Sequence, residues 1–427
     1  MILAYQVLST LIYPFLVIFI YFRKIIKKED PLRYKEKILP SHFNVTKKEN
    51  LKLIWFHATS IGELKSIIPI LEEINFNKKK VEFLITTTTL SSGNIAIKEL
   101  KKFNNIHHRY FPLDINFLIN QFLNLWKPNA IFLVDSEIWP NLIFKINEKK
   151  IPLALINGRI TSKTYKKWML FPKTARKIFK LFDLCLVSNA ETKNYLKDLD
   201  AKNIFFYGNI KLVSTIDKNK ISNRNEEILL KNKFWLAAST HKGEDKMFLD
   251  THLKLKNEYN DIITIIAPRH IDRSQEIKTL SENYNLNTQI LNENETISKN
   301  KEIVILNSFG ILHNYFKYAK SVFIGKSTLK KLRDVGGQNP IDAARLGCKI
   351  YHGPYVYNFK EIYELLEKNN VSKKINNFNE LSSNLIKDLK YSQKEGNKIS
   401  SLINNLGQKI LTDTMKKINY FLLNEIK

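Results

Sequence analysis

Short apolar runs alternate with segments of helical length along most of the chain, and this alternation restricts the fold more than any other feature. The runs are nearly continuously apolar, as expected of parallel strands that helices cover on both faces. Intervening segments such as SSGNIAIKELKKF and FLINQFLNLW have helical length. The pattern therefore predicts doubly wound α/β sheets. The predicted strands are LKLIWFH (51–57), VEFLITT (81–87), NAIFLVD (129–135), PLALIN (152–157), LCLVS (184–188), FWLAAS (234–239), DIITIIAP (261–268), EIVILN (302–307), KSVFIG (320–325) and CKIYHG (348–353).

A polar stretch, VSTIDKNKISNRNEE (213–227), interrupts the alternation, and we interpret it as a linker. The chain has 427 residues, which is enough for two or three domains of roughly 150 residues. We therefore expect two Rossmann-like doubly wound domains, 23–212 and 228–400, with a cleft between them.

Two regions depart from this alternation. From about residue 378 onward a helical period dominates. It predicts a pair of helices, with 401–427 as a C-terminal helix that packs back on the first domain. The Asn-rich stretch 283–301 carries no strong core signal and is expected to be mostly loop.

The first 22 residues are expected to form a membrane anchor. Ile2 to Phe22 is an uncharged run of about the length that crosses a bilayer as a helix, and RKIIKK follows at once. A secretory signal would place its positive charge before the apolar run and a small-residue cleavage site after it. Basic residues after the helix place the rest of the chain in the cytoplasm by the positive-inside rule. Pro14 and the interspersed tyrosines leave open a helix that lies in the membrane interface instead.

The composition is that of a globular protein with a strong excess of positive charge. Hydrophobic residues make up 44% and charged residues 26%, and Lys+Arg 68 against Asp+Glu 41 gives a formal net charge of +27. Two explanations of this excess are equally good. One is a biased amino-acid composition, and the other is attraction to an anionic membrane or to phosphorylated substrates. Cys185 and Cys348 have no metal-ligand spacing, so a disulfide framework and a cysteine zinc site are both disfavoured, and a reducing compartment is expected.

Ligands of doubly wound sheets bind outside the carboxyl ends of the strands, so the polar residues after each strand are the candidates for function. Glu63 ends the motif HATSIGE, and Glu137 lies in DSEIWPN after another strand. Paired carboxylates suit acid and base work, because one acts as a base while the other orients its neighbours. The plainer interpretation is that each glutamate begins a helix, where the macrodipole favours negative charge.

The second half offers candidate anion sites. In GGQNPIDAA, Gly336 and Gly337 come directly before a helix whose start Asn339 and Pro340 indicate, and such an entry binds phosphate. SFG at 308–310 is a second entry of this kind. Two further cations are candidates. Arg269 in APRH suits a phosphate or carboxylate, and Lys211 would lie at the mouth of the cleft. His270 is more often structural in such a position.

Several function classes are disfavoured by missing patterns. Neither a His-x-x-x-His pair nor clustered carboxylates with metal-ligand spacing occur near these loops. A Walker loop and a G-x-G-x-x-G loop are absent, which argues against the commonest nucleoside triphosphate and dinucleotide sites. No stripe of basic and aromatic residues indicates nucleic-acid binding.

With these motifs assembled, the chain resembles the 3-deoxy-D-manno-octulosonic acid (Kdo) transferases, which are membrane-anchored glycosyltransferases with the two-Rossmann-domain GT-B fold. The resemblance runs from the N-terminal anchor to near the C-terminus. The motifs that carry it, in the family's order and spacing, are HATSIGE, TTTT, DSEIWPNLI, INGRITS, GNIKL, STHKGE, APRH, GGQNPIDAA and GPYVYNFKE.

The resemblance implies transfer of Kdo from CMP-Kdo to the lipid A precursor (lipid IVA) on the cytoplasmic side of the inner membrane, with inversion and release of CMP. It implies no metal and no other cofactor. By this resemblance Glu63 is the general base, and Glu137 and Lys211 stabilise the transition state. The residues that match the family's CMP-binding segments are Pro268, Arg269, Phe309, Gly310, Ile311, Asn339, Pro340, Ile341 and Asp342.

The chain departs from the family pattern at a few positions. Gly325, Lys326 and Ser327 stand where the family usually has G-G-[ST], Gln338 replaces a common histidine, and Asp342 replaces a glutamate. The shorter side chain of Asp342 puts a direct contact with the nucleotide ribose in doubt. The number of Kdo residues added, the acylation of the acceptor and the oligomeric state stay open.

Two other functions compete with the Kdo transferase hypothesis. One is another GT-B enzyme that uses a different nucleotide sugar, either a UDP-sugar transferase or an epimerase, which would not need the anchor. The other is a membrane-tethered protein that binds nucleic acid or lipid without catalysis. That protein would need a basic stripe on one face, whereas the charges here are dispersed along the sequence.

Overall fold

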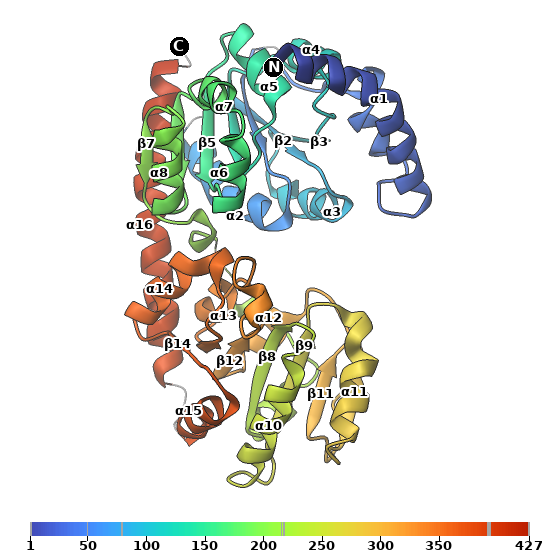
Figure 1. Cartoon of the computed structure of the whole chain (residues 1–427), viewed down its shortest axis with the longest axis vertical. Coiled ribbons are helices and arrows are strands. Elements are labelled where there is room, and N and C mark those ends of the chain that lie inside the picture. Colours follow the sequence, from blue (N-terminus) through green and yellow to red (C-terminus); the bar gives the residue numbers. More distant parts are fainter. Residues whose placement is uncertain are drawn as a thin grey trace. The chain divides into compact units, whose positions relative to one another are not determined.

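The chain divides into two compact α/β units (Figure 1). The computed structural model describes residues 2–48, 50–77, 80–214, 216, 218–390 and 394–425. Unit 1 comprises Met1–Ser214 with Gly407–Lys427, and unit 2 comprises Thr215–Leu406. Each unit is built around a seven-stranded sheet in which all strand pairs are parallel.

Unit 1 has the strand order β3-β2-β1-β4-β5-β6-β7. Its strands are β1 (Lys52–His57), β2 (Val81–Thr87), β3 (Ile106–Tyr110), β4 (Ala130–Val134), β5 (Leu153–Gly158), β6 (Leu184–Val187) and β7 (Ile204–Phe206). Its α-helices are α1 (Ile2–Ile25), α2 (Ile61–Asn77), α3 (Leu90–Glu99), α4 (Asn116–Trp126), α5 (Pro140–Glu148), α6 (Ser162–Trp168), α7 (Pro172–Phe179) and α8 (Ala190–Asp198). Short 3-10 helices are η1 (Arg33–Lys37), η2 (Pro40–His42), η3 (Leu100–Lys102) and η4 (Ile210–Leu212).

Unit 2 has the strand order β10-β11-β9-β8-β12-β13-β14. Its strands are β8 (Phe234–Thr240), β9 (Ile263–Pro268), β10 (Thr288–Leu291), β11 (Ile303–Leu306), β12 (Ser321–Ile324), β13 (Lys349–His352) and β14 (Ser372–Lys374). Its α-helices are α9 (Glu226–Lys231), α10 (Asp245–Lys256), α11 (Ser274–Glu282), α12 (Leu312–Phe316), α13 (Ile341–Arg345), α14 (Lys360–Lys368) and α15 (Phe378–Lys390). Short 3-10 helices are η5 (Lys218–Lys220), η6 (Ile271–Arg273), η7 (Lys330–Leu332) and η8 (Tyr357–Phe359).

Every apolar run that predicts a strand is a strand in the structure, and the doubly wound fold class is confirmed. The sequence prediction missed β3, β7, β10 and β14, which are the four edge strands of the two sheets. An edge strand has a neighbour on one side only, so it needs no continuous apolar run, and β3 (IHHRY) and β14 (SKK) are accordingly polar. The stretch 283–301 is mostly loop, as predicted, and β10 is the regular element that the prediction missed there.

A buried tryptophan anchors the first strand of each sheet to the next strand in the chain. The indole N–H of Trp55 in β1 donates to the Thr86 hydroxyl of β2 at 2.9 Å, and that of Trp235 in β8 donates to the Thr264 hydroxyl of β9 at 2.8 Å. Both tryptophans are fully buried. The ring fills the core while its single polar group has a partner, so the burial leaves no donor unsatisfied.

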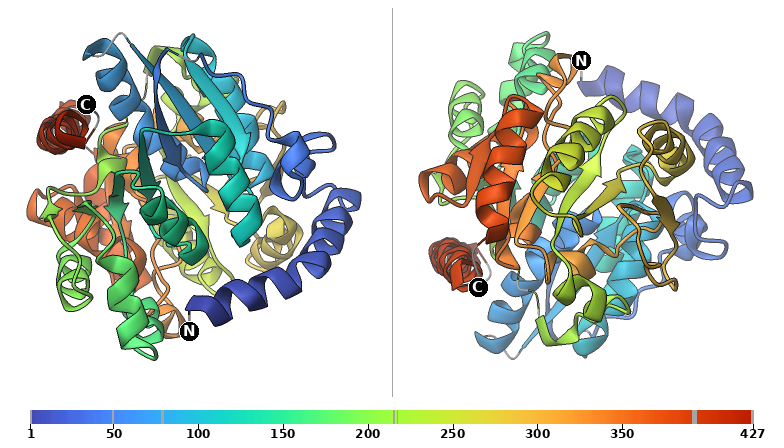
Figure 2. Two further views of the ribbon diagram at one scale, coloured as in Figure 1. Left: turned by 90° about the horizontal axis from the view of Figure 1, so that it is seen from above. Right: turned by 90° about the horizontal axis from the view of Figure 1, so that it is seen from below.

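The long C-terminal helix α16 (Lys394–Glu425) has contacts in both units. In unit 2 the Ser400 hydroxyl donates to the Arg345 carbonyl at 2.8 Å. In unit 1 the Phe421 ring meets the Phe132 ring of β4 edge-on, with 5.4 Å between centroids. The unit 1 part of α16 and the N-terminal helix α1 lie on opposite sides of that unit (Figures 1 and 2).

Replacing Gly407 of α16 by alanine should destabilise unit 1, although alanine in a helix is normally more stable than glycine by about 0.5–1 kcal/mol. A Cβ at this position would lie 2.2 Å from the backbone carbonyl oxygen of Leu212. Overpacking costs about 1–3 kcal/mol, so we expect a net loss of about 1–2 kcal/mol. Thermal unfolding followed by circular dichroism measures the change.

The control for this prediction is Asn405→Ala, an exposed position of the same helix. That variant should be as stable as the parent or slightly more so, because alanine has the higher helix propensity. A Gly407→Ala protein that unfolds at or above the parent temperature would contradict the close approach of the two backbones.

Candidate active site

Both sheets contain a topological switch point beside their first strand. In unit 1 the chain proceeds outward from β1 through β2 to β3 and then returns to β4 on the other side of β1. In unit 2 the switch point lies between β8 and β12. Loops diverge at such a point and leave room for a ligand at the carboxyl edge of the sheet. In unit 1 the motif HATSIGE lies at the end of β1 and DSEIWPN at the end of β4. In unit 2 the motif STHKGE lies at the end of β8 and the segment 325–328 at the end of β12.

Glu63 lies in the first turn of α2, directly beyond β1, and is 9% exposed. Its carboxylate accepts hydrogen bonds from the Thr59 backbone N–H at 2.8 Å and the Ser60 hydroxyl at 2.7 Å. Burial raises the pKa of Glu63, and repulsion from Asp135 and Glu137 adds to the rise, while the two hydrogen bonds oppose it. A carboxyl with a raised pKa accepts a proton more readily near neutral pH.

The hydrogen bonds of Glu63 also match the plainer interpretation of this residue. The Ser60 hydroxyl accepts from the Glu63 backbone N–H at 3.3 Å, which together with the bonds above makes a capping arrangement at the start of α2. The glutamate therefore begins the helix and also faces two further carboxylates. The second property is the one that a capping role does not require.

Glu137 lies between β4 and α5, in surroundings that favour its charged form. Its carboxylate accepts a hydrogen bond from the Trp139 indole N–H at 2.8 Å and lies 3.4 Å from Nε2 of the fully buried His57. Burial alone would raise the pKa of Glu137, but interactions with His57, Thr59 and Trp139 outweigh it, and the pKa is lowered. Nδ1 of His57 lies 2.9 Å from the Thr86 hydroxyl, which orients the ring.

Lys211 lies in η4 and pairs with a residue that the sequence prediction did not select. Its Nζ donates to Oδ2 of Asp135 at 2.9 Å. Asp135 follows β4 directly and has a positive φ of 64°, a conformation that aspartate tolerates better than most residues. The side chain of Lys211 also passes over Gly62, whose added Cβ would lie 4.0 Å from Cε.

The structure therefore brings Glu63, Glu137 and Lys211 to the carboxyl edge of β1 and β4, and their catalytic roles stay a prediction. Sequence reasoning missed Asp135 and His57 as members of this cluster. Both stand inside the quoted motifs DSEIWPN and HATSIGE, at the end of a strand, and this position is the signal that could have identified them.

Glu244 in unit 2 is a second buried carboxylate that sequence reasoning did not select. It is fully buried, and its oxygens accept hydrogen bonds from the backbone N–H groups of His241, Lys326, Ser327 and Thr328, at 2.8–3.1 Å. The Thr328 hydroxyl adds another at 3.0 Å. This carboxylate joins the loop after β8 to the loop after β12, so it shapes the switch point of unit 2.

Lys326 stands where the Kdo transferases, by the resemblance above, usually carry the second glycine of G-G-[ST]. It has a positive φ of 60°, which glycine adopts at no steric cost. The preceding Gly325 has no room for a side chain, because a Cβ would lie 2.6 Å from the Thr240 Cα. In this chain a lysine therefore adopts a backbone conformation that glycine reaches without strain.

The segments predicted to bind CMP follow three strands of unit 2. Arg269 follows Pro268 at the end of β9, and its backbone N–H donates to the Thr240 carbonyl at 3.0 Å. Its guanidinium is exposed and has no hydrogen-bond or ion-pair partner in the part of the chain that the structure describes. Phe309 is 62% exposed after β11, and Gly310 has a positive φ of 82°.

Two of these segments are joined directly. Nε2 of His313 in α12 lies 3.0 Å from Oδ2 of Asp342 in α13, so the loop with Ile311 and the stretch from Asn339 to Asp342 lie together. The side chain of Asn339 accepts from the backbone N–H of Ile341 at 3.0 Å, which confirms the predicted helix start. Pro340 and Ile341 are buried and hold this start in place. Sequence reasoning missed His313, and a single histidine in a short helix offers little signal.

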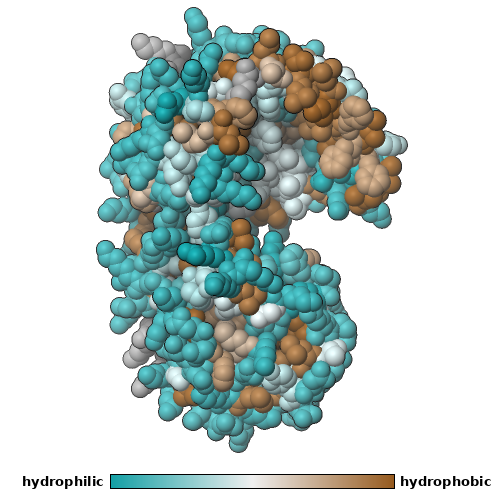
Figure 3. All heavy atoms as spheres, in the orientation of Figure 1, coloured by the Kyte–Doolittle hydropathy of each residue, from teal (hydrophilic) through white to brown (hydrophobic). Residues whose placement is uncertain are grey.

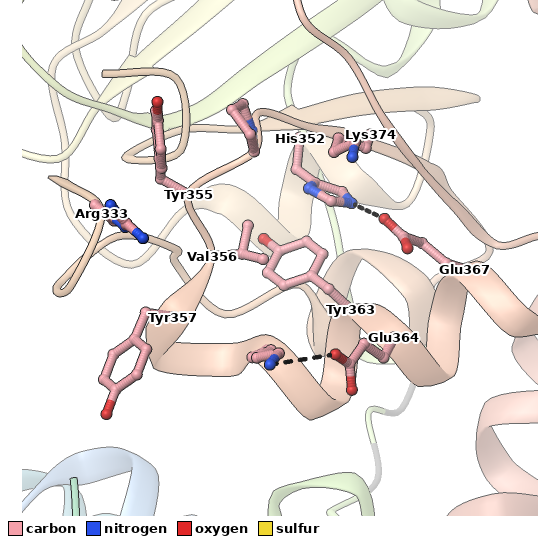
Figure 4. A pocket seen from close by; sticks show the side chains of 11 residues that line it. Arg333, His352, Tyr355, Val356, Tyr357, Tyr363, Glu364, Glu367 and Lys374 are labelled. Atoms are coloured by element: carbon pink, nitrogen blue, oxygen red, sulfur yellow. Dashed lines mark ion pairs between the residues drawn. The ribbon is translucent and has the colours of Figure 1, made fainter. Parts of the chain in front are cut away.

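A cavity of about 360 Å³ opens beside the motif GPYVYNFKE (Figure 4). Nε2 of His352 lies 2.9 Å from Oε1 of Glu367 at one side. Burial lowers the pKa of His352, although Glu367 opposes the change. Arg333 and Lys374 add positive charge to the lining. Within the described ranges of the chain, no group of three or more His, Cys, Asp or Glu residues could hold a metal ion.

Comparison with known proteins identifies the family. Residues 33–214 match the family model of 3-deoxy-D-manno-octulosonic-acid transferase (kdotransferase). A 3-deoxy-D-manno-octulosonic acid transferase from Rickettsia bellii is 31% identical over 362 residues, which cover 82% of each chain. The chain belongs to the Kdo transferase family. A probable mitochondrial Kdo transferase from Arabidopsis thaliana is 30% identical over 330 residues, which cover 74% of this chain and 72% of that protein.

Comparison with solved structures identifies the fold of this Kdo transferase family member. A glycosyltransferase from Rickettsia africae superposes with a TM-score of 0.58 at 11% identity, over 87% of this chain and 99% of that one. At this identity the likeness shows the fold alone, which is the predicted GT-B type. The predicted enzyme class, a glycosyltransferase of the Kdo transferase family, is confirmed by the named relatives.

Glu244→Gln should destabilise unit 2 by at least about 2 kcal/mol, because the amide has one acceptor oxygen and turns an N–H₂ donor toward the backbone donors that the carboxylate now satisfies. Chemical denaturation followed by circular dichroism measures the loss.

The matched control is Glu282→Gln, which removes the charge of an exposed residue paired with Lys278 at 3.6 Å. An exposed pair contributes little, so this variant should unfold with the parent. Equal stability of the Glu244 and Glu282 variants would show that the buried carboxylate does not hold the two loops together.

Proposed function

We propose that this Kdo transferase family member transfers Kdo from CMP-Kdo to the lipid A precursor (lipid IVA), with inversion and release of CMP, in lipopolysaccharide biosynthesis. The pair of carboxylates at the edge of β1 and β4 carries the proposal. The pKa of Glu63 is raised and that of Glu137 is lowered. Two neighbouring carboxyls with opposite shifts divide into a proton acceptor and a stabiliser of positive charge.

The chemistry assigns a role to each group of unit 1. The acceptor is a sugar hydroxyl, and it passes its proton to Glu63 as its oxygen forms the new bond to the anomeric carbon of Kdo. The bond between that carbon and the phosphate oxygen of CMP breaks at the same time, with inversion. Glu137 stays ionised and stabilises positive charge that develops on the sugar. Lys211, held by Asp135 at 2.9 Å, keeps further N–H groups for negative charge that develops in the transition state.

Unit 2 is proposed to hold the leaving nucleotide. Pro268 with Arg269, the loop Phe309 to Ile311, and the stretch Asn339 to Asp342 are the proposed CMP contacts. Arg269 is exposed at the carboxyl end of β9, where a guanidinium can pair with a phosphate. Asp342 is engaged with His313, so the two side chains together, rather than Asp342 alone, are proposed to face the ribose hydroxyls.

The proposed location is the inner membrane, with both units on the cytoplasmic side. Helix α1 is long and apolar enough to bind a membrane. The basic residues that follow it, and the formal net charge of +27, favour an anionic membrane surface and a phosphorylated acceptor. The second candidate, a GT-B enzyme with another nucleotide sugar, differs in the donor and is tested in the same assay.

Incubation of the full chain in detergent with CMP-Kdo and tetra-acylated lipid A precursor should release CMP, because the acceptor hydroxyl is then available to the proposed base. A reaction without acceptor is the background. UDP-sugars in place of CMP-Kdo should release no UDP above that background. If no CMP is released in response to the acceptor, the assignment of donor and acceptor is wrong. Turnover of a UDP-sugar instead would contradict it as well.

Glu63→Gln should lower turnover by about 10²–10⁴-fold, the usual contribution of general base catalysis, and leave CMP binding unchanged because the proposed CMP segments lie in unit 2. In the parent protein the rate should fall as the pH drops below the raised pKa of Glu63, because the protonated carboxyl accepts no proton. The measurements are steady-state rates across pH and CMP titration calorimetry.

The Glu63→Gln substitution should also change how the free energy of unfolding depends on pH, in a defined direction. A raised pKa in the folded state means that the parent loses stability as the pH rises above 4.5, the ordinary value for this carboxyl. Glutamine cannot ionise, so the variant should gain stability relative to the parent over that range. Glu73→Gln, at an exposed position of α2, should keep both the activity and the pH dependence of the parent. Near-parent turnover of Glu63→Gln would remove Glu63 as the base.

A further inference from the structure

Helix α1 presents a mixed polar and apolar side to the protein and an almost entirely apolar side to the surroundings. The residues of its protein-facing side recur at helical spacing and include polar groups: Ile2, Gln6, Ser9, Tyr13, Leu16 and Ile20. The opposite side is almost entirely apolar and exposed, with Leu3 at 74% and Phe15 at 71% exposure. Figure 3 shows hydrophobic side chains gathered along this side of α1. Its members are Leu3, Val7, Leu8, Leu11, Ile12, Phe15, Ile18, Phe19, Phe22 and Ile25.

A continuous apolar side that is exposed is unusual for a surface helix of a soluble protein, because such a helix turns its apolar stripe to the core and its polar side outward. A helix of 24 residues is about 36 Å long at 1.5 Å per residue, so the exposed stripe is far longer than the scattered apolar side chains of ordinary surfaces. Such a stripe is stable only against an apolar medium. A lipid bilayer supplies one, and Lys24, Lys27 and Lys28 at the end of the helix match its anionic headgroups.

Hydrogen bonds hold α1 against unit 1 along its length. The Tyr5 hydroxyl donates to the Asp114 carboxylate at 3.1 Å, near the start of the helix. In the middle, the Tyr13 hydroxyl donates to the Ile38 carbonyl at 2.5 Å. The Tyr13 ring also packs edge-on against Phe117 of α4.

Two more bonds complete the series. The side-chain amide of Asn141 in α5 donates to the Ser9 hydroxyl at 3.1 Å, and Arg23 in the last turn donates to Glu29 at 2.7 Å. Contacts from Tyr5 to Arg23 therefore place the whole helix on the surface of one folded unit.

The docked position is incompatible with a helix that crosses the bilayer. If α1 spanned the membrane while docked, its contacts at Asp114 and Asn141 would lie within the hydrocarbon layer. The Asp114 carboxylate also accepts hydrogen bonds from the backbone N–H groups of Asn141 and Leu142 at the start of α5, and burial raises its pKa to about 6. A carboxyl group at that depth is costly, because it must either keep its charge in hydrocarbon or take up a proton.

If α1 instead detached from unit 1 and crossed the bilayer, the hydrogen bonds and the ring contact described above would all be lost. Tyr13 and Leu16, which pack against the core of unit 1, would be withdrawn with the helix.

We propose that α1 lies in the plane of the membrane, with its outer side in the lipid, its inner side on unit 1, and both of its ends on the side of the membrane that holds the rest of the chain. The inference rests on the proposed membrane location but not on the proposed donor or acceptor. The sequence left open whether the helix spans the membrane or lies in its interface. The contacts of α1 with unit 1 favour the interface.

The two arrangements differ in where they place the start of the chain. A short Gly-Ser-Cys extension before residue 2 serves as the reporter, because the native Cys185 and Cys348 are fully buried and give little background. The full chain is produced in a Gram-negative host and treated with a membrane-impermeant maleimide, in spheroplasts and in inverted inner-membrane vesicles. We expect labelling in the inverted vesicles and labelling at background in the spheroplasts. Lys27→Cys, after the helix, is the control and should behave in the same way.

The outcomes separate this inference from the proposed function. Labelling of the N-terminal cysteine in spheroplasts, with Lys27→Cys labelled only in inverted vesicles, would show a spanning helix and overturn the inference alone. Failure of the protein to float with vesicles of anionic phospholipid would overturn both the membrane location and the inference. Neither result depends on transferase activity.

A cross-link tests the docked position directly. In native membranes, Tyr13→Cys combined with Phe117→Cys should be bridged by a short bis-maleimide, because the two rings lie 5.1 Å apart. Phe15→Cys combined with Phe117→Cys is the matched control and should not be bridged, because Phe15 is on the outer side of the helix. Equal bridging of the two pairs, or of neither, would contradict the docked helix.

Discussion

The parallel arrangement of strands is the constraint on which the rest of this structure depends. Every strand in both sheets runs in the same direction as its neighbours, so all segments that follow a strand emerge at one edge. In each sheet the chain later crosses to the other side of the first strand, which creates a switch point between β1 and β4 and between β8 and β12, and the loops at these points diverge. Motifs that are far apart in the sequence therefore lie together within each unit, because each of them follows a strand of the same parallel sheet.

Three glutamates at these edges show how local surroundings divide one side chain into separate tasks. Glu63 is buried beside other carboxylates, which raises its pKa, as the proposed role of a proton acceptor requires. Glu137 is also buried, but an indole and an imidazole stabilise its charge. Glu244 accepts hydrogen bonds from four backbone N–H groups and is committed to the shape of its loops. The residue type is the same in each case, and the number and kind of donors around it decide the outcome.

The N-terminal helix extends this reasoning from the site to the surface. Its hydropathy and length are those of a spanning segment, and no feature of composition distinguishes the two modes of membrane binding. The hydrogen bonds that join Tyr5, Ser9 and Tyr13 to unit 1 do distinguish them, because a polar group that bonds to a folded unit ties the helix to it.

The sequence by itself determined the central strands of both sheets and the family, because buried parallel strands require continuous apolar runs. It also indicated Glu63, Glu137 and Lys211 as candidates, because their motifs directly follow these strands. It did not determine the edge strands, which are only half covered and need no such pattern. Nor did it indicate the pairing of Lys211 with Asp135 or of His313 with Asp342. Only the tertiary structure decided these pairings and the opposite pKa shifts of the two catalytic candidates, since both depend on burial and on donors contributed by distant segments.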